Sequence, residues 1–177
     1  MQFDGRASFV QTVVQAGDRI SNTNLTTAFA TKYTIPANDI IPGVAIFISA
    51  SGEYGTANVP TNRAFDSLQV SLGGNLMLGV GSKTPNGINI GGATWTFLAK
   101  LICVLDGPSG EVEGSALWTF TDSTLGGSND QVWANATNLP FALDTSIAND
   151  VELAVRYFTA AAANYIQMRH LIIYVGV

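Results

Sequence analysis

The feature that most constrains the fold is a long segment, residues 93–105, that is apolar on both of its sides. Its sequence, ATWTFLAKLICVL, is rich in the β-branched and aromatic residues that favour strands. Alternate residues of a strand point to opposite sides of the sheet. One side carries Trp95, Phe97, Ala99, Leu101, Cys103 and Leu105, and the other carries Thr96, Leu98, Lys100, Ile102 and Val104. The segment predicts a strand that is covered on both sides.

An antiparallel sandwich strand normally exposes one side to water, so the cover over the second apolar side of 93–105 needs a source. Two sources stay open: a neighbouring subunit, or a loop or the N-terminal segment folded over the strand. Charged residues make up 12% of the chain, about half the usual share of roughly 25%. This favours equally a neutral polar surface and a surface buried against other chains. For the subunit alternative, the sequence predicts an interface of Leu98, Lys100, Ile102, Val104 and His170.

His170 is the only histidine and lies in the last predicted strand. Strict alternation places it on one side with Ile166, Met168, Ile172 and Tyr174. A lone histidine on an apolar side is expected to be a packed residue, within the chain or at a subunit contact.

The remaining pattern is strands separated by turns. Residues 33–52 hold two strands joined by a connection that Pro36 and Pro42 bracket, with turn residues at Asn38-Asp39 and Pro42-Gly43. Further extended segments are expected at 9–15, 25–34, 65–72, 76–80, 112–120, 141–145, 151–157 and 165–175. With eight to ten strands and no amphipathic helix, the sequence predicts an all-β fold. We expect a single antiparallel β-sandwich of jelly-roll type at 25–177, preceded at 1–24 by an N-terminal arm or edge strand.

No residue constellation predicts catalysis. One histidine and one cysteine leave no base–nucleophile pair or transition-metal set, and serine-elbow and phosphate-loop motifs are absent. Cys103 lies in an apolar strand and is expected to be a buried structural thiol. The oxygen-bearing residues Asp122, Ser123, Asn129 and Asp130 match no calcium-loop spacing. We therefore expect no enzyme, no cofactor and no metal.

Sugar binding without chemistry stays open, because Tyr54 and Trp133 fall in predicted polar loops, 52–62 and 121–138. An exposed aromatic ring on a loop can stack on a sugar, but it can equally be a lid on the core.

Charge and hydropathy bear on other partners. The net charge is −5 and no two bases are adjacent, which argues against nucleic acid. No apolar run approaches about 18 residues, so no membrane span is expected. The first ten residues, MQFDGRASFV, lack the apolar core of a signal peptide, so we expect a cytosolic protein or one assembled there into something larger.

Several segments together resemble a known family over about residues 25–175. They are YTIPAN and IPG followed by VAIFISASG, the LQVSLGGNLM hairpin, the ATWTFLAKLICVLDGPSGEVEG hairpin, and ALDTSIANDVELAVRYFTAAAANYIQMRHLIIY at the end. The chain resembles bacteriophage virion structural proteins with a tumour-necrosis-factor-like jelly-roll domain. The resemblance implies a homotrimer that serves as a capsid decoration (cement) protein, a head fibre or a receptor-binding fibre tip.

Because the chain lacks a fibre shaft, the expected role is a capsid decoration protein that clamps adjacent capsomers. Its partner would be the major capsid protein, and its place the capsid surface of a virion assembled in the host cytoplasm. A capsid-contacting arm is expected at the N-terminus, through Phe3, Arg6, Phe9 and Val10. The alternative is a receptor-binding module whose loops 52–62, 81–92 and 121–138 recognise a host-surface glycan.

Overall fold

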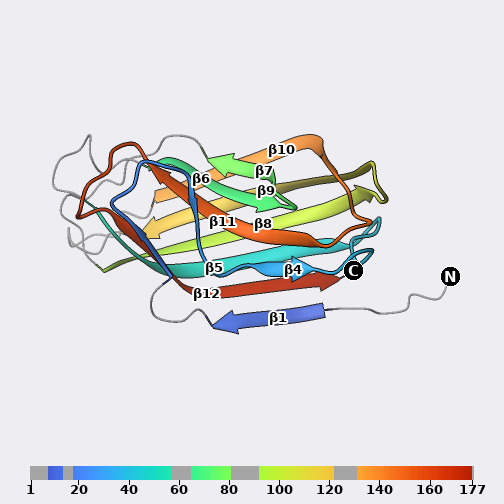
Figure 1. The fold of residues 1–177 in the computed structure, drawn as a ribbon, viewed down its shortest axis with the longest axis horizontal. Helices are drawn as coiled ribbons and strands as arrows, with labels where there is room; N and C mark the ends of the chain where they lie inside the picture. The colour runs from blue at the N-terminus through green and yellow to red at the C-terminus, as the bar shows by residue number, and fades with distance from the viewer. Residues whose placement is uncertain (1–7, 14–17, 57–64, 81–91, 122–130, 177) are drawn as a thin grey trace.

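The computed structural model describes residues 8–13, 18–56, 65–80, 92–121 and 131–176; of residues 8–13, 65–66, 76–80 and 131–139 it describes the backbone only. These residues form twelve strands, and the described part contains no helix (Figure 1). The strands are β1 (Ser8–Val13), β2 (Arg19–Ser21), β3 (Thr27–Ala28), β4 (Tyr33–Ile35), β5 (Ala45–Gly55), β6 (Phe65–Leu72), β7 (Asn75–Val80), β8 (Ala93–Leu105), β9 (Gly110–Thr121), β10 (Gln131–Leu143), β11 (Asn149–Tyr157) and β12 (Tyr165–Gly176). The all-β class is confirmed.

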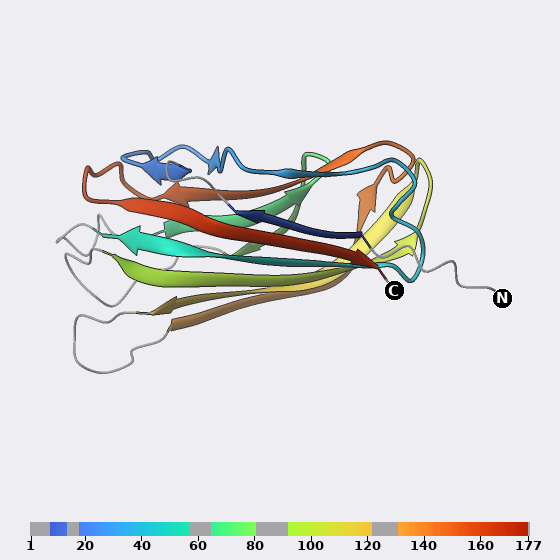
Figure 2. The same ribbon diagram turned by 90° about the horizontal axis from the view of Figure 1, so that it is seen from below.

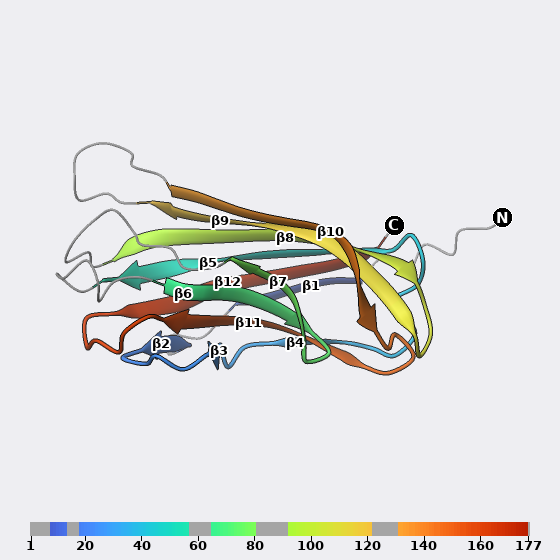
Figure 3. The same cartoon turned by 90° about the horizontal axis from the view of Figure 1, so that it is seen from above.

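The strands form two antiparallel sheets. The larger has the order β1-β12-β5-β8-β9-β10, with β2 also paired to β12. The smaller has the order β3-β11-β6-β7, with β4 also paired to β11. A single cluster of buried side chains draws on both sheets, which lie one above the other as the layers of a β-sandwich (Figure 3). The predicted sandwich is therefore confirmed.

Aromatic rings from β8 and β9 fill much of the core. The ring of Trp118 lies 4.5 Å from that of Phe97 and 5.3 Å from that of Trp95, between centroids. The indole N–H of Trp95 donates to the carbonyl oxygens of Gln167, at 3.1 Å, and Glu53, at 3.2 Å. These bonds satisfy the one polar atom of a buried ring and tie β8 to β5 and β12.

The strand pairs are nested about the β8–β9 hairpin. β5 pairs with β12 and β6 with β11, while β7 contacts β10. Nested pairs of this kind occur in a ribbon that folds back on itself, as in a jelly roll. However, β8, β9 and β10 follow one another within one sheet, so the jelly-roll topology stays a prediction.

The strand count exceeds the expected eight to ten because the N-terminal part is more finely divided. The strand expected at 25–34 consists of two short pieces, β3 and β4, which both pair with β11. Between them the backbone leaves the sheet, where Asp18 accepts hydrogen bonds from the N–H groups of Ala30 and Thr31 at 2.8 Å.

The N-terminal strands lie at the edge of the larger sheet and not over its face. β1 and β2 follow each other along the same edge of β12, with Ser8 opposite Val175 and Ser21 opposite Tyr165. In the described part of segment 1–24, the chain therefore forms edge strands, which is one of the two predicted alternatives.

Turn chemistry fixes the connections as expected. Asn38 and Gly43 adopt positive φ angles of 63° and 86° in the connection between β4 and β5. Gly73 and Gly74, at 60° and 79°, form the two-residue turn of the β6–β7 hairpin. Two consecutive positive φ angles match the twist of a tight hairpin, which glycine adopts without strain.

Candidate interaction surface

The side of the larger sheet that faces away from the core carries a mainly apolar surface, here called the outer face. Strand register fixes its composition, because opposite residues on neighbouring strands share a side. The outer face consists of two rows that cross β12, β5, β8 and β9 in turn: Tyr174, Phe47, Lys100 and Ser115, then Ile172, Ser49, Leu98 and Leu117.

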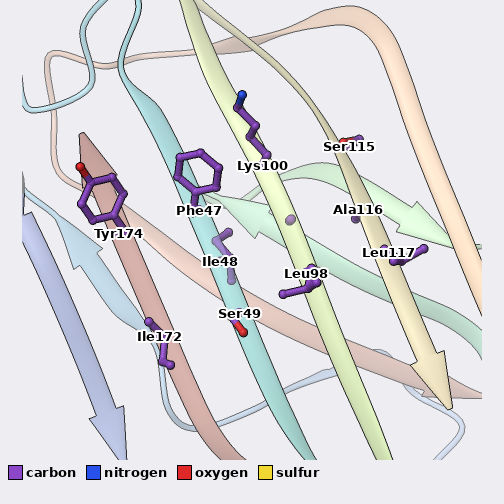
Figure 4. Close-up of a pocket in the computed structure, with 11 residues that line it drawn as sticks. Phe47, Ile48, Ser49, Leu98, Lys100, Ser115, Ala116, Leu117, Ile172 and Tyr174 are labelled. Carbon is purple, nitrogen blue, oxygen red and sulfur yellow. The ribbon is translucent and has the colours of Figure 1, made fainter. Parts of the chain in front are cut away.

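These side chains line a hollow with a volume of about 470 Å³ (Figure 4). Leu98 is 52% exposed and Phe47 is 42% exposed, although both are large apolar residues. The rings of Phe47 and Tyr174 lie 6.0 Å apart across two strands. Among the described residues nothing covers the hollow, so it is a surface open to a partner.

Lys100 supplies the positive charge within this surface. Its Nζ lies 5.4 Å from the centroid of the Phe47 ring, a cation–π arrangement. No ion pair between described residues includes Lys100. The ammonium group is thus held beside an aromatic ring and not by a carboxylate.

Most of the predicted interface residues lie on this side of the sheet. Leu98 and Lys100 line the hollow, and Ile102 lies in the next row toward one end. His170 is exposed in the next row toward the other end, opposite Ser51. Whether another subunit contacts them stays a prediction.

Two β-bulges change the expected sides. At Arg169 the register of β12 shifts by one residue, so Ile166 and Met168 are buried while His170 lies on the outer side. The prediction that these three share a side is therefore wrong, because a bulge reverses the alternation. Ile172 and Tyr174 do lie with His170.

The second bulge lies at Val104, between Cys103 and Leu105. It turns Leu105 out of the core side, leaving it 48% exposed next to Val104 at 44%. The expectation that Leu105 is buried with Cys103 is wrong for this reason. Val104 lies at the end of β8, beyond the hollow.

The predicted loop aromatics lie in strands. Tyr54 belongs to β5, is 1% exposed and packs edge-on against Phe120 with 5.1 Å between ring centroids. The prediction of a ligand-binding Tyr54 is therefore wrong, and the core alternative holds. Trp133 belongs to β10, with its backbone opposite Trp118, and its side chain lies outside the described residues. The sequence misleads here because Gly52 and Gly55 suggest a turn where β5 continues.

The predicted arm residues are only partly described. Phe3 and Arg6 lie outside the described residues. Phe9 and Val10 are described by their backbone, which pairs with Tyr174 and Ile173. Their capsid contact stays a prediction.

Cys103 is buried, and its thiol donates to the carbonyl oxygen of Leu105 at 3.3 Å. Burial, with a smaller contribution from the charge of Asp106, raises the pKa of this thiol. A thiol in this state is a poor nucleophile.

The described residues contain no group of three potential metal-ligating side chains. The candidate calcium residues Asp122, Ser123, Asn129 and Asp130 lie outside the described residues. Nor does the described part of the chain include a helix long and apolar enough to cross a bilayer.

Several members of the outer face were not anticipated from the sequence, notably Phe47, Leu117 and Tyr174. A signal was present, since Phe47 stands between Ile46 and Ile48 and so places one large apolar residue on the other side of β5. The pairing of β5 with both β8 and β12 is what brings these side chains together.

The sequence matches no protein-family model, and no curated protein is significantly similar to it.

Proposed function

We propose that the protein is a non-enzymatic structural protein of a bacteriophage virion, and specifically a trimeric capsid decoration (cement) protein that clamps adjacent capsomers. The observation that carries the proposal is the open, apolar outer face of an all-β sandwich. Contiguous exposed apolar surface on a folded protein usually marks a contact with another protein.

A second and third copy of the chain are the occupants that fit the outer face best. Leu98 and Phe47 are already about half buried, so burying the rest of either side chain at a contact stabilises it by about 1 kcal/mol. Lys100, Ile102 and His170 would lie within or beside the same contact. The low charge of the whole chain agrees with a surface that is largely shared with neighbours.

The virion role is supported by the resemblance of residues 25–175 to phage jelly-roll proteins. In this role the protein lies on the capsid surface, contacts the major capsid protein, and needs binding surfaces and no catalytic group. The arm residues Phe3 and Arg6 are proposed to take part, and removing residues 1–7, upstream of β1, should weaken shell binding without loss of the fold.

The alternative is a head- or tail-fibre module that recognises a host-surface glycan. Its support is weaker, because buried Tyr54 is no longer available to a ligand and Trp133 is the remaining candidate. It is kept as an outcome of the binding test.

The oligomeric state is tested by analytical ultracentrifugation of the wild type and two matched variants. We expect a mass three times the 18.6 kDa of one chain. Leu98→Lys should dissociate the trimer, because it replaces three apolar side chains of the contact by three further positive charges. Leu25→Lys, at a site 70% exposed and away from the outer face, should leave it intact. A wild type that stays monomeric at micromolar concentration would refute the trimer.

The role is tested by mixing the protein with undecorated phage shells and, separately, with host cells. Co-sedimentation with shells is the expected result. Binding to cells and not to shells would refute the decoration role and favour the receptor-binding alternative.

A further inference from the structure

One end of the sandwich, at the right of Figure 1, is built by three connections, here called the acidic end. They are 36–44 between β4 and β5, 106–109 between β8 and β9, and 144–148 between β10 and β11. The acidic end also includes Val104 and Leu105, the last residues of β8, and Glu111 at the start of β9. It is separate from the outer face, whose hollow lies along the strands.

Hydrogen bonds, most of them between backbone groups, hold the three connections to one another. The N–H of Asn38 donates to the carbonyl of Thr145 at 3.0 Å. Thr145 in turn accepts from the N–H of Gly107 through its hydroxyl, at 2.8 Å, and donates its own N–H to the carbonyl of Gly107, at 3.0 Å. The N–H of Gly43 donates to the carbonyl of Cys103 at 3.1 Å. Loops cross-linked in this way present their side chains in fixed positions.

Exposed apolar side chains collect on this end. Ile147 is 55% exposed, Leu105 48%, Ile41 47% and Val104 44%. They come from the connections 36–44 and 144–148 and from the end of β8. Half of the large apolar residues that are exposed in the described part of the chain are therefore here.

Among the described residues, the charge of this end has one sign. It carries Asp39, Asp106, Glu111 and Asp144, and its three connections contain no lysine, arginine or histidine. Four negative charges thus lie at one end of a chain whose net charge is only −5. Such a surface repels nucleic acid and attracts a protein surface that presents lysine or arginine around an apolar centre.

We propose that the acidic end is the surface by which the protein docks on the shell, against a basic, partly apolar surface of a capsid subunit. This inference rests on the decoration role proposed above and names the part of the molecule that performs it. β1 begins at the same end, since Ser8 lies opposite Val175 and Gly176 opposite Ala45.

Three-fold symmetry strengthens the contact. Rotation about an axis leaves the height of each atom along that axis unchanged, so the three acidic ends of a trimer lie at one level. Three sites that engage one shell together bind far more tightly than one alone.

The experiment measures co-sedimentation of the trimer with undecorated shells at low and high salt. The test variants are Ile147→Ser and Asp106→Lys, which remove an exposed apolar group and reverse a charge. The matched controls are Leu25→Ser and Phe158→Ser, at sites 70% and 64% exposed at the opposite end. Ultracentrifugation and thermal melting first establish that each variant is a folded trimer.

We expect shell affinity to fall about tenfold or more for each test variant, to stay unchanged for both controls, and to decrease for the wild type as salt rises. If both test variants bind shells as tightly as the wild type does, docking through the acidic end is overturned and the decoration role is left intact. Loss of affinity in the controls instead would move the contact to the other end. Wild type that binds no shells at all would overturn the decoration role itself.

Discussion

Gly52 shows how closely three strands pass one another behind the outer face. A Cβ atom at this position would lie 1.9 Å from the carbonyl oxygen of Gln167 on β12 and 3.0 Å from Nε1 of Trp95 on β8. The first contact is with backbone, which cannot move aside without breaking the β5–β12 ladder. Only glycine fits here, for steric reasons.

We therefore predict that Gly52→Ala lowers the free energy of unfolding by about 2–3 kcal/mol, as overpacked cores do. Urea denaturation followed by tryptophan fluorescence measures the change. Ser51→Ala, one residue away on the same strand, is the control and should shift the midpoint little. Equal midpoints for wild type and Gly52→Ala would show that β5 and β12 separate easily at this point.

Cys103 gives a second prediction at the scale of one residue. Its burial raises the pKa of the thiol and closes access to it, so little reactive thiolate is present at pH 8. A colourless disulfide reagent that releases a coloured thiolate should react slowly with the native protein and fast in denaturant. Rapid reaction of the native protein at pH 8 would mean that the end of β8 opens readily.

At this scale the sequence predicted burial well wherever alternation was unbroken. Trp95, Phe97 and Cys103 were placed correctly on the core side. Tyr54 was not, because glycines on both sides of it suggested a loop. Gly52 is instead a close-packing position, and a glycine's steric role depends on neighbours that are distant in sequence.

Among the elements, β4 is a three-residue strand that depends on polar contacts at its border. Lys32 Nζ and the hydroxyl of Thr34 both donate hydrogen bonds to the carboxylate of Asp150 on β11. The hydrogen bond from Lys32, and then that from Thr34, lower the pKa of Asp150. The same carboxylate raises the pKa of Lys32.

A group whose pKa is lowered by folding adds stability above its unfolded pKa, about 3.9 for Asp, and loses it as the pH falls through the folded value. We predict that amide exchange in β4 accelerates as the pH is lowered below about 4, after correction for intrinsic exchange. In Asp150→Asn the exchange should be faster at neutral pH and lack this acid-dependent increase. Glu152→Gln removes the longer ion pair with Lys32, at 3.7 Å, and should change the exchange rate of β4 less. Identical pH profiles for wild type and Asp150→Asn would refute the role of Asp150.

Strand existence was predictable, but bulges were not. The extra residues at Val104 and Arg169 reverse which side of the strand faces the core, yet nothing in their local sequence differs from regular strand. A bulge is set by how two neighbouring strands match in length and twist. This is why Leu105 and the first half of β12 were assigned to the wrong sides.

For the whole molecule, the sandwich followed from the number and spacing of apolar strands, whereas the sheet order did not. The order β1-β12-β5-β8-β9-β10 joins the two ends of the chain, and such long-range pairing leaves no local signal. The outer face was half predictable for the same reason. Leu98 and Lys100 stand out within one strand, but Phe47 and Tyr174 join them only through pairing.

Under the proposed docking, the position of the last strand determines where cargo can be fused to the protein. β12 ends beside Ala45, at the acidic end, as Figure 2 shows for the C-terminus. Cargo fused after this strand would emerge where docking is proposed and should hinder attachment to particles. The same cargo inserted between Ala162 and Ala163, in an exposed connection at the opposite end, should be carried outward with attachment preserved. The amount of each fusion that is retained on shells measures this difference. If the expected difference is found, a foreign epitope is best inserted into this connection and not after β12.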